Sequence, residues 1–155
     1  MVLASNLCLF WIVVNLFVML PKKITRDETL FLFLTSSLLI MFALINPAKR
    51  LYIGDPGLHY SAEQGIAFLV NRNLIFPFLT IIAVNLMQYG IQWQKGVTVL
   101  ISFLTFILYS YIEERYTVVS HVSLPSRISF FFLYFALILL LLKGFRLLAE
   151  TEPLR

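Results

Sequence analysis

The sequence predicts an all-α integral membrane protein, a single domain built as a bundle of five transmembrane helices. Two observations lead to this prediction. The 155 residues are 60% hydrophobic and only 13% charged, whereas a soluble domain is about 45–50% apolar and about 25% charged. The apolar residues also form long runs, and about 20 mainly apolar residues suffice for a helix to cross a bilayer. The lipid bilayer is therefore the expected partner of most of the surface.

The predicted helices follow one another along the whole chain with short connections. They cover approximately residues 2–20, 26–46, 62–89, 97–113 and 128–146. The first has no basic stretch before it and no small-residue cleavage pattern after it, so we expect a retained helix rather than a signal peptide. Pro47 is predicted to stop the second helix, because proline cannot donate a backbone hydrogen bond.

Two predicted helices begin with a capping-box pattern, in which a hydroxyl residue is followed three positions later by Glu or Gln. The second helix has Thr25 and Glu28, and the third has Ser61 and Gln64. In each pair the side chains are expected to bond the backbone N–H groups of the first turn. These patterns predict where the two helices start.

The third predicted helix organises the chain, because it is apolar along its length yet carries a charge well inside the apolar pattern. That charge is Arg72, and Pro77 lies near the middle of the same helix. Proline kinks a helix, which membrane proteins tolerate when neighbours satisfy the freed carbonyl. Asn71 and Asn85 fall within about 40° of each other on an ideal helix.

The third and fourth predicted helices form a hairpin around a tight turn at residues 90–96. Arg72 lies about twenty residues before the centre of this turn and Glu113 about twenty after it, so both reach a similar depth in the membrane. An arginine near the hydrocarbon edge either extends to the headgroups or pairs with a carboxylate. Under the pairing hypothesis, Arg72 faces Glu113 or Glu114.

Polar side chains recur at helical spacing along the fourth predicted helix, in a stripe about 80° wide. The stripe consists of Thr98, Ser102, Thr105, Tyr109 and Glu113. The favoured interpretation is that these groups hold helices together or bond their own backbone. The alternative is a polar seam. The resulting candidate intramembrane polar cluster contains Arg72, Glu113, Glu114, Asn71, Asn85, Ser102, Thr105 and Tyr109.

The other predicted helices carry few polar side chains. Thr35-Ser36-Ser37 is expected to let a neighbouring helix approach closely. Asn6 and Asn15 lie about 180° apart on the first helix and so share no face. The lone Cys8, inside an apolar run, predicts a buried and inert thiol. The fifth helix is apolar all round and is predicted to face lipid over most of its surface.

The flanking charges predict an outside N-terminus and a cytoplasmic C-terminus. With five spans, the predicted cytoplasmic side holds Lys22, Lys23, Arg26, Lys95, Lys143, Arg146 and Arg155. The opposite side holds Lys49, Arg50, Arg72, Arg115 and Arg127. Basic residues favour the cytoplasmic side, and those after the first helix often dominate. Because the net charge of +4 is scattered beside apolar runs, no nucleic-acid partner is predicted.

No catalytic, cofactor-binding or metal-binding motif is recognised. The sequence has no Gly-x-Ser-x-Gly elbow, no His-Glu-x-x-His pair and no glycine-rich phosphate loop. We therefore expect a non-enzymatic, membrane-embedded accessory or interaction protein without a cofactor. Its partners would be the bilayer and another membrane protein or a second copy. The alternative is a small transporter or channel component that uses the polar face between the third and fourth helices.

Two short elements and the compact length resemble a family of small uncharacterised multi-pass membrane proteins from Gram-positive spore formers. The elements are Pro21-Lys22-Lys23 after the first helix and Tyr111-Ile112-Glu113-Glu114 near the end of the fourth. The similarity covers most of the chain and implies a multi-pass membrane fold. That family has no established activity, so the resemblance implies no residue roles.

Overall fold

The computed structural model describes residues 2–52, 61–89, 92–116 and 123–151, with side chains for 3–42, 61–89, 94–112 and 123–149. The regular structure in these ranges is helical throughout, without a strand, so the all-α prediction is confirmed. The elements are α1 (Val2–Met19), α2 (Arg26–Tyr52), α3 (Ala62–Val70), the π-helical turn η1 (Asn71–Ile75), α4 (Phe76–Met87), α5 (Gln92–Tyr116) and α6 (Leu124–Thr151).

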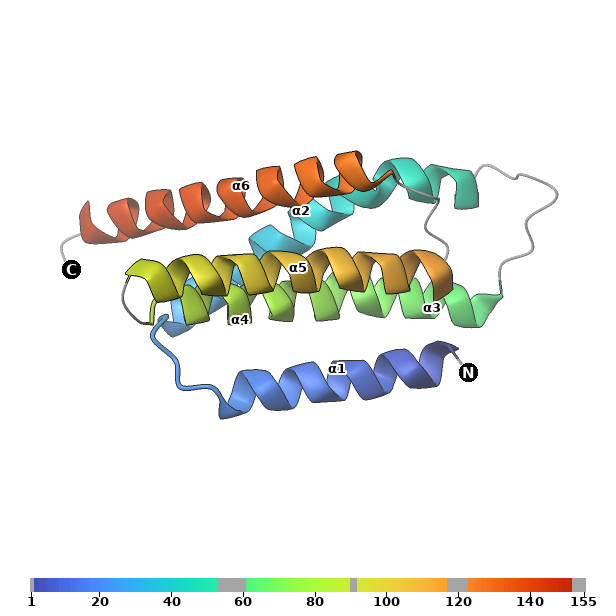
Figure 1. The fold of residues 1–155 in the computed structure, drawn as a ribbon, viewed down its shortest axis with the longest axis horizontal. Coiled ribbons are helices and arrows are strands. Elements are labelled where there is room, and N and C mark those ends of the chain that lie inside the picture. Colours follow the sequence, from blue (N-terminus) through green and yellow to red (C-terminus); the bar gives the residue numbers. More distant parts are fainter. Residues whose placement is uncertain (1, 53–60, 90–91, 117–122, 152–155) are drawn as a thin grey trace.

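The helices run up and down along one long axis, as Figure 1 shows. Elements α3, η1 and α4 follow one another without a break and form one rod in the middle of the bundle. Helix α1 lies on one side of this central rod, α2 and α6 lie on the other, and α5 runs alongside it. The N-terminal and C-terminal ends lie at opposite ends of the long axis.

The central rod is the most buried of the long apolar helices. In its most apolar 18-residue window 56% of the residues are buried, against 11% for α5 and 22% for α6. Helices α1, α2 and α5 all contact it, and its α4 part makes the most extensive helix–helix contact of the bundle, with α2. The segment that the sequence marks by its internal charge is therefore the one around which the others pack.

Three helices in the described part of the chain are long and apolar enough to cross a membrane. They cover Ala62–Met87, Gln94–Ile112 and Leu124–Ala149. Helix α1 adds a shorter apolar stretch, Leu3–Met19. This composition is compatible with a membrane protein.

Both predicted capping boxes form. At the start of α2 the backbone N–H of Thr25 donates to Glu28 Oε2 at 2.9 Å, and that of Glu28 donates to Thr25 Oγ1 at 3.2 Å. At the start of α3 the corresponding bonds between Ser61 and Gln64 measure 3.0 Å and 3.2 Å. These bonds satisfy N–H groups that lack a helical acceptor, so they define where the two helices begin.

Two helix ends next to prolines differ from the prediction. Helix α2 continues through Pro47 to Tyr52, so this proline lies within the helix rather than after it. Helix α6 begins at Leu124 rather than Ile128. Its Pro125 lies in the first turn, where a missing N–H removes no helical hydrogen bond.

The predicted interfacial turn at residues 90–96 is shorter than expected. Helix α5 already begins at Gln92 and includes Gly96. Glycine breaks helices less effectively in membrane proteins, where it is more frequent within helices than in soluble proteins. The hairpin between α4 and α5 is therefore tighter than the sequence pattern suggests, while residues 90 and 91 lie outside the described part.

Pro77 is accommodated by a widened turn in the central rod. The backbone N–H of Phe76 bonds to the carbonyl of Asn71, five residues earlier, which defines η1. Proline lacks an N–H and its ring crowds the carbonyl four residues before it, and local π-helical adjustments re-satisfy such groups in membrane helices. The sequence predicts a disturbance at this position, and the structure gives it the form of a π-helical turn.

Aromatic rings fill the space around the central rod. On the side of α5 and α6, Phe76 contacts three rings at centroid distances of 5.0–6.2 Å, those of Phe106, Tyr109 and Phe131. On the side of α1 and α2, Phe78 contacts three others at 5.3–6.1 Å, those of Phe10, Phe17 and Phe33. Tilted, edge-on and stacked ring contacts at these distances stabilise a core beyond the burial of area alone.

The two outer helices α1 and α6 each turn one narrow face inward. In α6 the buried apolar stripe is Phe131, Tyr134, Ile138 and Leu142, while large neighbours such as Phe132 and Leu133 are exposed. In α1, Asn6 is buried and Asn15 exposed, as their spacing predicts. Cys8 lies on the exposed face. The prediction of a buried thiol is wrong, because an apolar run does not show which of its residues face the core.

Candidate functional site

Three buried hydroxyl groups from three helices meet in the bundle. The Tyr134 Oη atom on α6 lies 2.5 Å from Ser36 Oγ on α2 and 2.6 Å from Thr80 Oγ1 on α4. The Ser36 hydroxyl is also 3.3 Å from Thr80 Oγ1, which donates to the Phe76 carbonyl at 2.9 Å. All three side chains are at most 3% exposed. We call Ser36, Thr80 and Tyr134 the hydroxyl cluster.

The hydroxyl cluster joins α2, the central rod and α6. Ser36 lies in the polar triplet that the sequence predicts as a close-approach site, and it is fully buried at the α2–α4 contact. Thr80 and Tyr134 were not foreseen, although each is a lone hydroxyl in an apolar stretch. Among the described contacts, the three hydroxyl groups bond one another and the Phe76 carbonyl, so they link three helices by hydrogen bonds.

A second polar contact joins the central rod to α5. The Tyr109 hydroxyl donates to Asn71 Oδ1 at 2.5 Å. Both side chains are buried, with exposed fractions of 6% and 1%. Both residues belong to the polar cluster predicted from the sequence, and the structure brings these two members together.

Asn85 lies at the other end of the central rod, at a separate site. Its Nδ2 donates to the Pro21 carbonyl at 2.8 Å, and its Oδ1 accepts from the Lys23 N–H at 2.8 Å. Tyr89 also donates to the Pro21 carbonyl, at 2.7 Å. Fourteen residues of helix separate Asn85 from Asn71, or about 21 Å. Asn85 therefore does not join Asn71 in one cluster but fastens the connection between α1 and α2.

Arg72 lies half-buried beside residues of its own helix. Its Nε donates to Asn73 Oδ1 at 3.1 Å, and its guanidinium carbon is 5.6 Å from the centre of the Phe68 ring. The side chains of Glu113 and Glu114 lie outside the described part of the structure. The pairing of Arg72 with either of them stays a prediction.

The hydroxyl stripe of α5 bonds mostly to its own helix. Thr98 donates to the Gln94 carbonyl at 2.9 Å, and Thr105 donates to the Ile101 carbonyl at 2.8 Å. Thr105 is exposed and Ser102 half-buried. Among the stripe residues whose side chains are described, Tyr109 forms a hydrogen bond to another helix, the bond to Asn71. The self-satisfied threonines agree with the favoured interpretation of the stripe.

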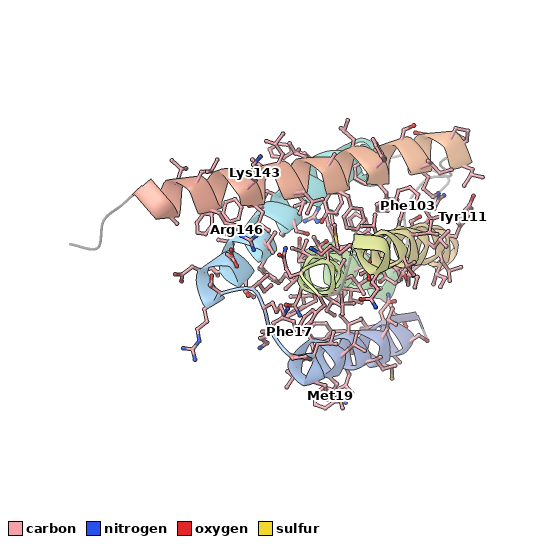
Figure 2. The ribbon with its side chains drawn as sticks, turned by 60° about the vertical axis from the view of Figure 1, so that its left-hand side comes forward. Phe17, Met19, Phe103, Tyr111, Lys143 and Arg146 are labelled. Carbon is pink, nitrogen blue, oxygen red and sulfur yellow. The ribbon has the colours of Figure 1, made fainter. Side chains whose placement is uncertain are left out.

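An ion pair that sequence reasoning missed ties α2 to α6. Arg146 Nε lies 2.5 Å from Glu28 Oε1, with side-chain exposures of 38% and 10%. Figure 2 shows Arg146 extending from α6 toward the first turn of α2. Glu28 thus caps its own helix and also binds a neighbour. The signal for this pairing was that Glu28 lies two residues after Arg26, which the sequence analysis places on the same membrane side as Arg146.

A second arginine was predicted in a connection but lies within α6. Arg127 is 4% exposed and donates through Nη1 to Ser110 Oγ at 2.8 Å. Its guanidinium carbon is 4.0 Å from the centre of the Tyr111 ring. The charge is thereby placed between α5 and α6. The earlier start of α6 explains why the sequence prediction missed this position.

No group of three or more His, Cys, Asp and Glu side chains that could hold a metal ion occurs in the described ranges. Comparison of the chain with protein-family models, with curated proteins and with solved structures gives no match.

Proposed function

We propose that this protein spans the membrane five times and acts as a non-catalytic, membrane-embedded accessory or interaction subunit. Helices α1, α2, α5 and α6 and the central rod would each cross the bilayer. The up-and-down course of the chain and the opposite positions of its ends support this number (Figure 1). The 18 residues of α1 extend about 27 Å, close to the hydrocarbon thickness of about 30 Å.

The observation that carries the proposal is the way in which buried polar side chains are used. Tyr134 bonds within the hydroxyl cluster, Asn71 bonds Tyr109, and Asn85 bonds the α1–α2 connection. These contacts join different helices at separate places, and aromatic rings pack around the rod between them. A transport pathway would instead need polar groups facing a shared space along the membrane depth, and catalysis would need a nucleophile beside a base.

Helix α5 offers a wide outward apolar face to a partner. Only 11% of its apolar window is buried, and Leu104 and Leu108 are 55% and 64% exposed. In a membrane such a face meets either lipid or another apolar helix. We therefore place the expected partner, another membrane protein or a second copy of this chain, on α5.

Site-specific photo-crosslinking in native membranes tests this role. A photoreactive phenylalanine analogue is placed at Leu104 in one variant and at Leu108 in another. Each variant should give one discrete protein adduct, and the two adducts should have the same mass. The same analogue at Phe106, which is 1% exposed, serves as the inward-facing control and should give none. Adducts with lipid alone at both outer positions would contradict a partner on α5.

An outside N-terminus and a cytoplasmic C-terminus remain the proposed orientation. Lys22, Lys23 and Arg26 are exposed where α1 gives way to α2, and such charges favour the cytoplasmic side. A phosphatase that is active only outside the cytoplasm, fused after Arg155, should be inactive. Activity of that fusion would reverse the orientation.

A small transporter or channel component is the second candidate. The polar stripe of α5 favours it, because polar groups inside a membrane often mark a pathway. Thr98 and Ser102 of this stripe are half-buried. Water access along α5 distinguishes this function from the first.

A further inference from the structure

The connection between α1 and α2 holds two lysines over aromatic rings. Lys22 Nζ lies 4.4 Å from the centre of the Phe17 ring, and Lys23 Nζ lies 4.5 Å from the centre of the Tyr89 ring. Both lysines are exposed. An ammonium group over an aromatic face is attracted to it, so each charge favours the position above its ring.

The backbone of this connection is also fixed. Asn85, which is 4% exposed, donates to the Pro21 carbonyl and accepts from the Lys23 N–H, both at 2.8 Å. Tyr89 donates to the same Pro21 carbonyl. A buried amide of the central rod thus sets the position of both lysines. A binding surface organised in advance loses less conformational freedom when a ligand arrives.

Exposed aliphatic side chains occur at the end of α1, a few residues before the two lysines. Leu16, Val18 and Met19 are 47%, 66% and 83% exposed. Figure 2 shows Met19 pointing outward at the end of α1. Three residues after this exposed apolar end of α1, the chain reaches the two exposed lysines. An anionic phospholipid has the complementary shape, a phosphate group above aliphatic chains.

We propose that Lys22, Lys23 and the adjoining face of α1 form a binding site for an anionic phospholipid. The phosphate would contact the two ammonium groups, and an acyl chain would lie along Val18 and Met19. Arg26 adds a further exposed positive charge, and Asp27 is the exposed acidic residue of the same stretch. This proposal depends on the membrane location proposed above. It does not depend on the number of spans or on the interaction role.

Native mass spectrometry of the full-length protein in detergent tests the site, because no charged membrane surface is present. The protein is offered equal amounts of phosphatidylglycerol and phosphatidylcholine with identical acyl chains, and the ratio of bound lipids is measured. The wild type should prefer phosphatidylglycerol. Each lysine near an anionic lipid contributes about 1 kcal/mol, so Lys22→Gln with Lys23→Gln should lower the preference on the order of thirtyfold.

A matched pair of substitutions distinguishes a specific lipid site from a nonspecific effect of positive charge. Lys95→Gln with Lys143→Gln removes the same charge from two other exposed lysines and should leave the preference unchanged. Lys22→Arg with Lys23→Arg should also preserve it. Asn85→Ala keeps both lysines but releases the connection, and it should lower the preference while the protein stays monodisperse.

Two results would overturn the proposal. One is a wild-type protein without a preference for phosphatidylglycerol, a result that needs no variant to fold. The other is an equal loss in both glutamine pairs. The photo-crosslinking and fusion experiments measure partner binding and orientation independently of lipid binding. If the protein inserts and crosslinks to its partner but shows no lipid preference, the lipid site is rejected and the proposed function stands.

Discussion

Oη of Tyr109 lies 2.5 Å from Oδ1 of Asn71, and this bond joins α5 to the widened turn of the central rod. The carbonyl of the same asparagine accepts the N–H of Phe76, five residues later. One residue thus carries both the irregular backbone bond next to Pro77 and the side-chain bond to a neighbouring helix. The position of α5 and the shape of the rod are therefore linked through Asn71.

Tyr109→Phe is expected to lower the free energy of unfolding by about 1–2 kcal/mol, because it leaves the buried Asn71 oxygen without its donor. Thermal unfolding followed by size-exclusion chromatography measures the change. Tyr111→Phe is the matched control, since Tyr111 is 40% exposed and keeps its ring beneath Arg127. Equal shifts in Tm for the two variants would show that the Asn71 bond contributes no stability.

The hydroxyl cluster is expected to be energetically coupled. Ser36→Ala and Tyr134→Phe each remove part of the same network, so the double variant should lose less stability than the two single changes added together. The coupling should be roughly 0.5–1.5 kcal/mol. Ser36→Ala combined with Thr105→Val is the control pair, because Thr105 bonds its own helix. Additive losses in the first pair would contradict the cluster.

Arg146→Gln should destabilise the contact between α2 and α6 modestly. The Arg146 side chain is 38% exposed, so solvent screening limits the expected loss to about 0.5–1 kcal/mol. The loss should shrink at high salt. Lys143→Gln removes an exposed charge one turn earlier on α6 and should change Tm less. Identical effects of the two changes would argue against a role for Glu28.

Arg72 and Glu113 remain a predicted pair, and a double-mutant cycle tests them. Arg72→Ala and Glu113→Ala should each lower stability, and their effects should be less than additive if the side chains meet. Arg72→Ala combined with Glu63→Ala, which lies earlier on the same rod, is the comparison pair for the size of the coupling. Independent, additive losses for Arg72 and Glu113 would mean that Arg72 extends to the headgroups instead.

Cysteines at Ser102 and Thr105 should be protected from a water-soluble maleimide if α5 faces lipid or a partner. The labelling is done in a Cys8→Ser background, because Cys8 is exposed on α1. A cysteine in place of Lys95, exposed in the first turn of α5, is the control that should react. Reaction at both Ser102 and Thr105 would favour the transporter or channel function over the accessory role.

Features that depend on neighbours along the chain were predictable. Thr25 and Ser61 mark helix starts because capping bonds act over three residues, and the disturbance at Pro77 follows from its missing N–H. Long apolar runs predict the helices themselves. The rule that proline ends a helix failed at Pro47 because it considers only local hydrogen bonds, whereas packing can supply other partners.

Local properties of the sequence, its long apolar runs and its capping residues, were enough to predict helices and to identify residues 62–89 as the segment that organises the chain. Which polar groups meet depended on how the helices pack in space. This packing brought Asn71 to Tyr109 and sent Asn85 to the α1–α2 connection, although both asparagines share one helix. The rotation and depth of each helix decide such contacts, and these are set by the packing of aromatic side chains from several helices at once.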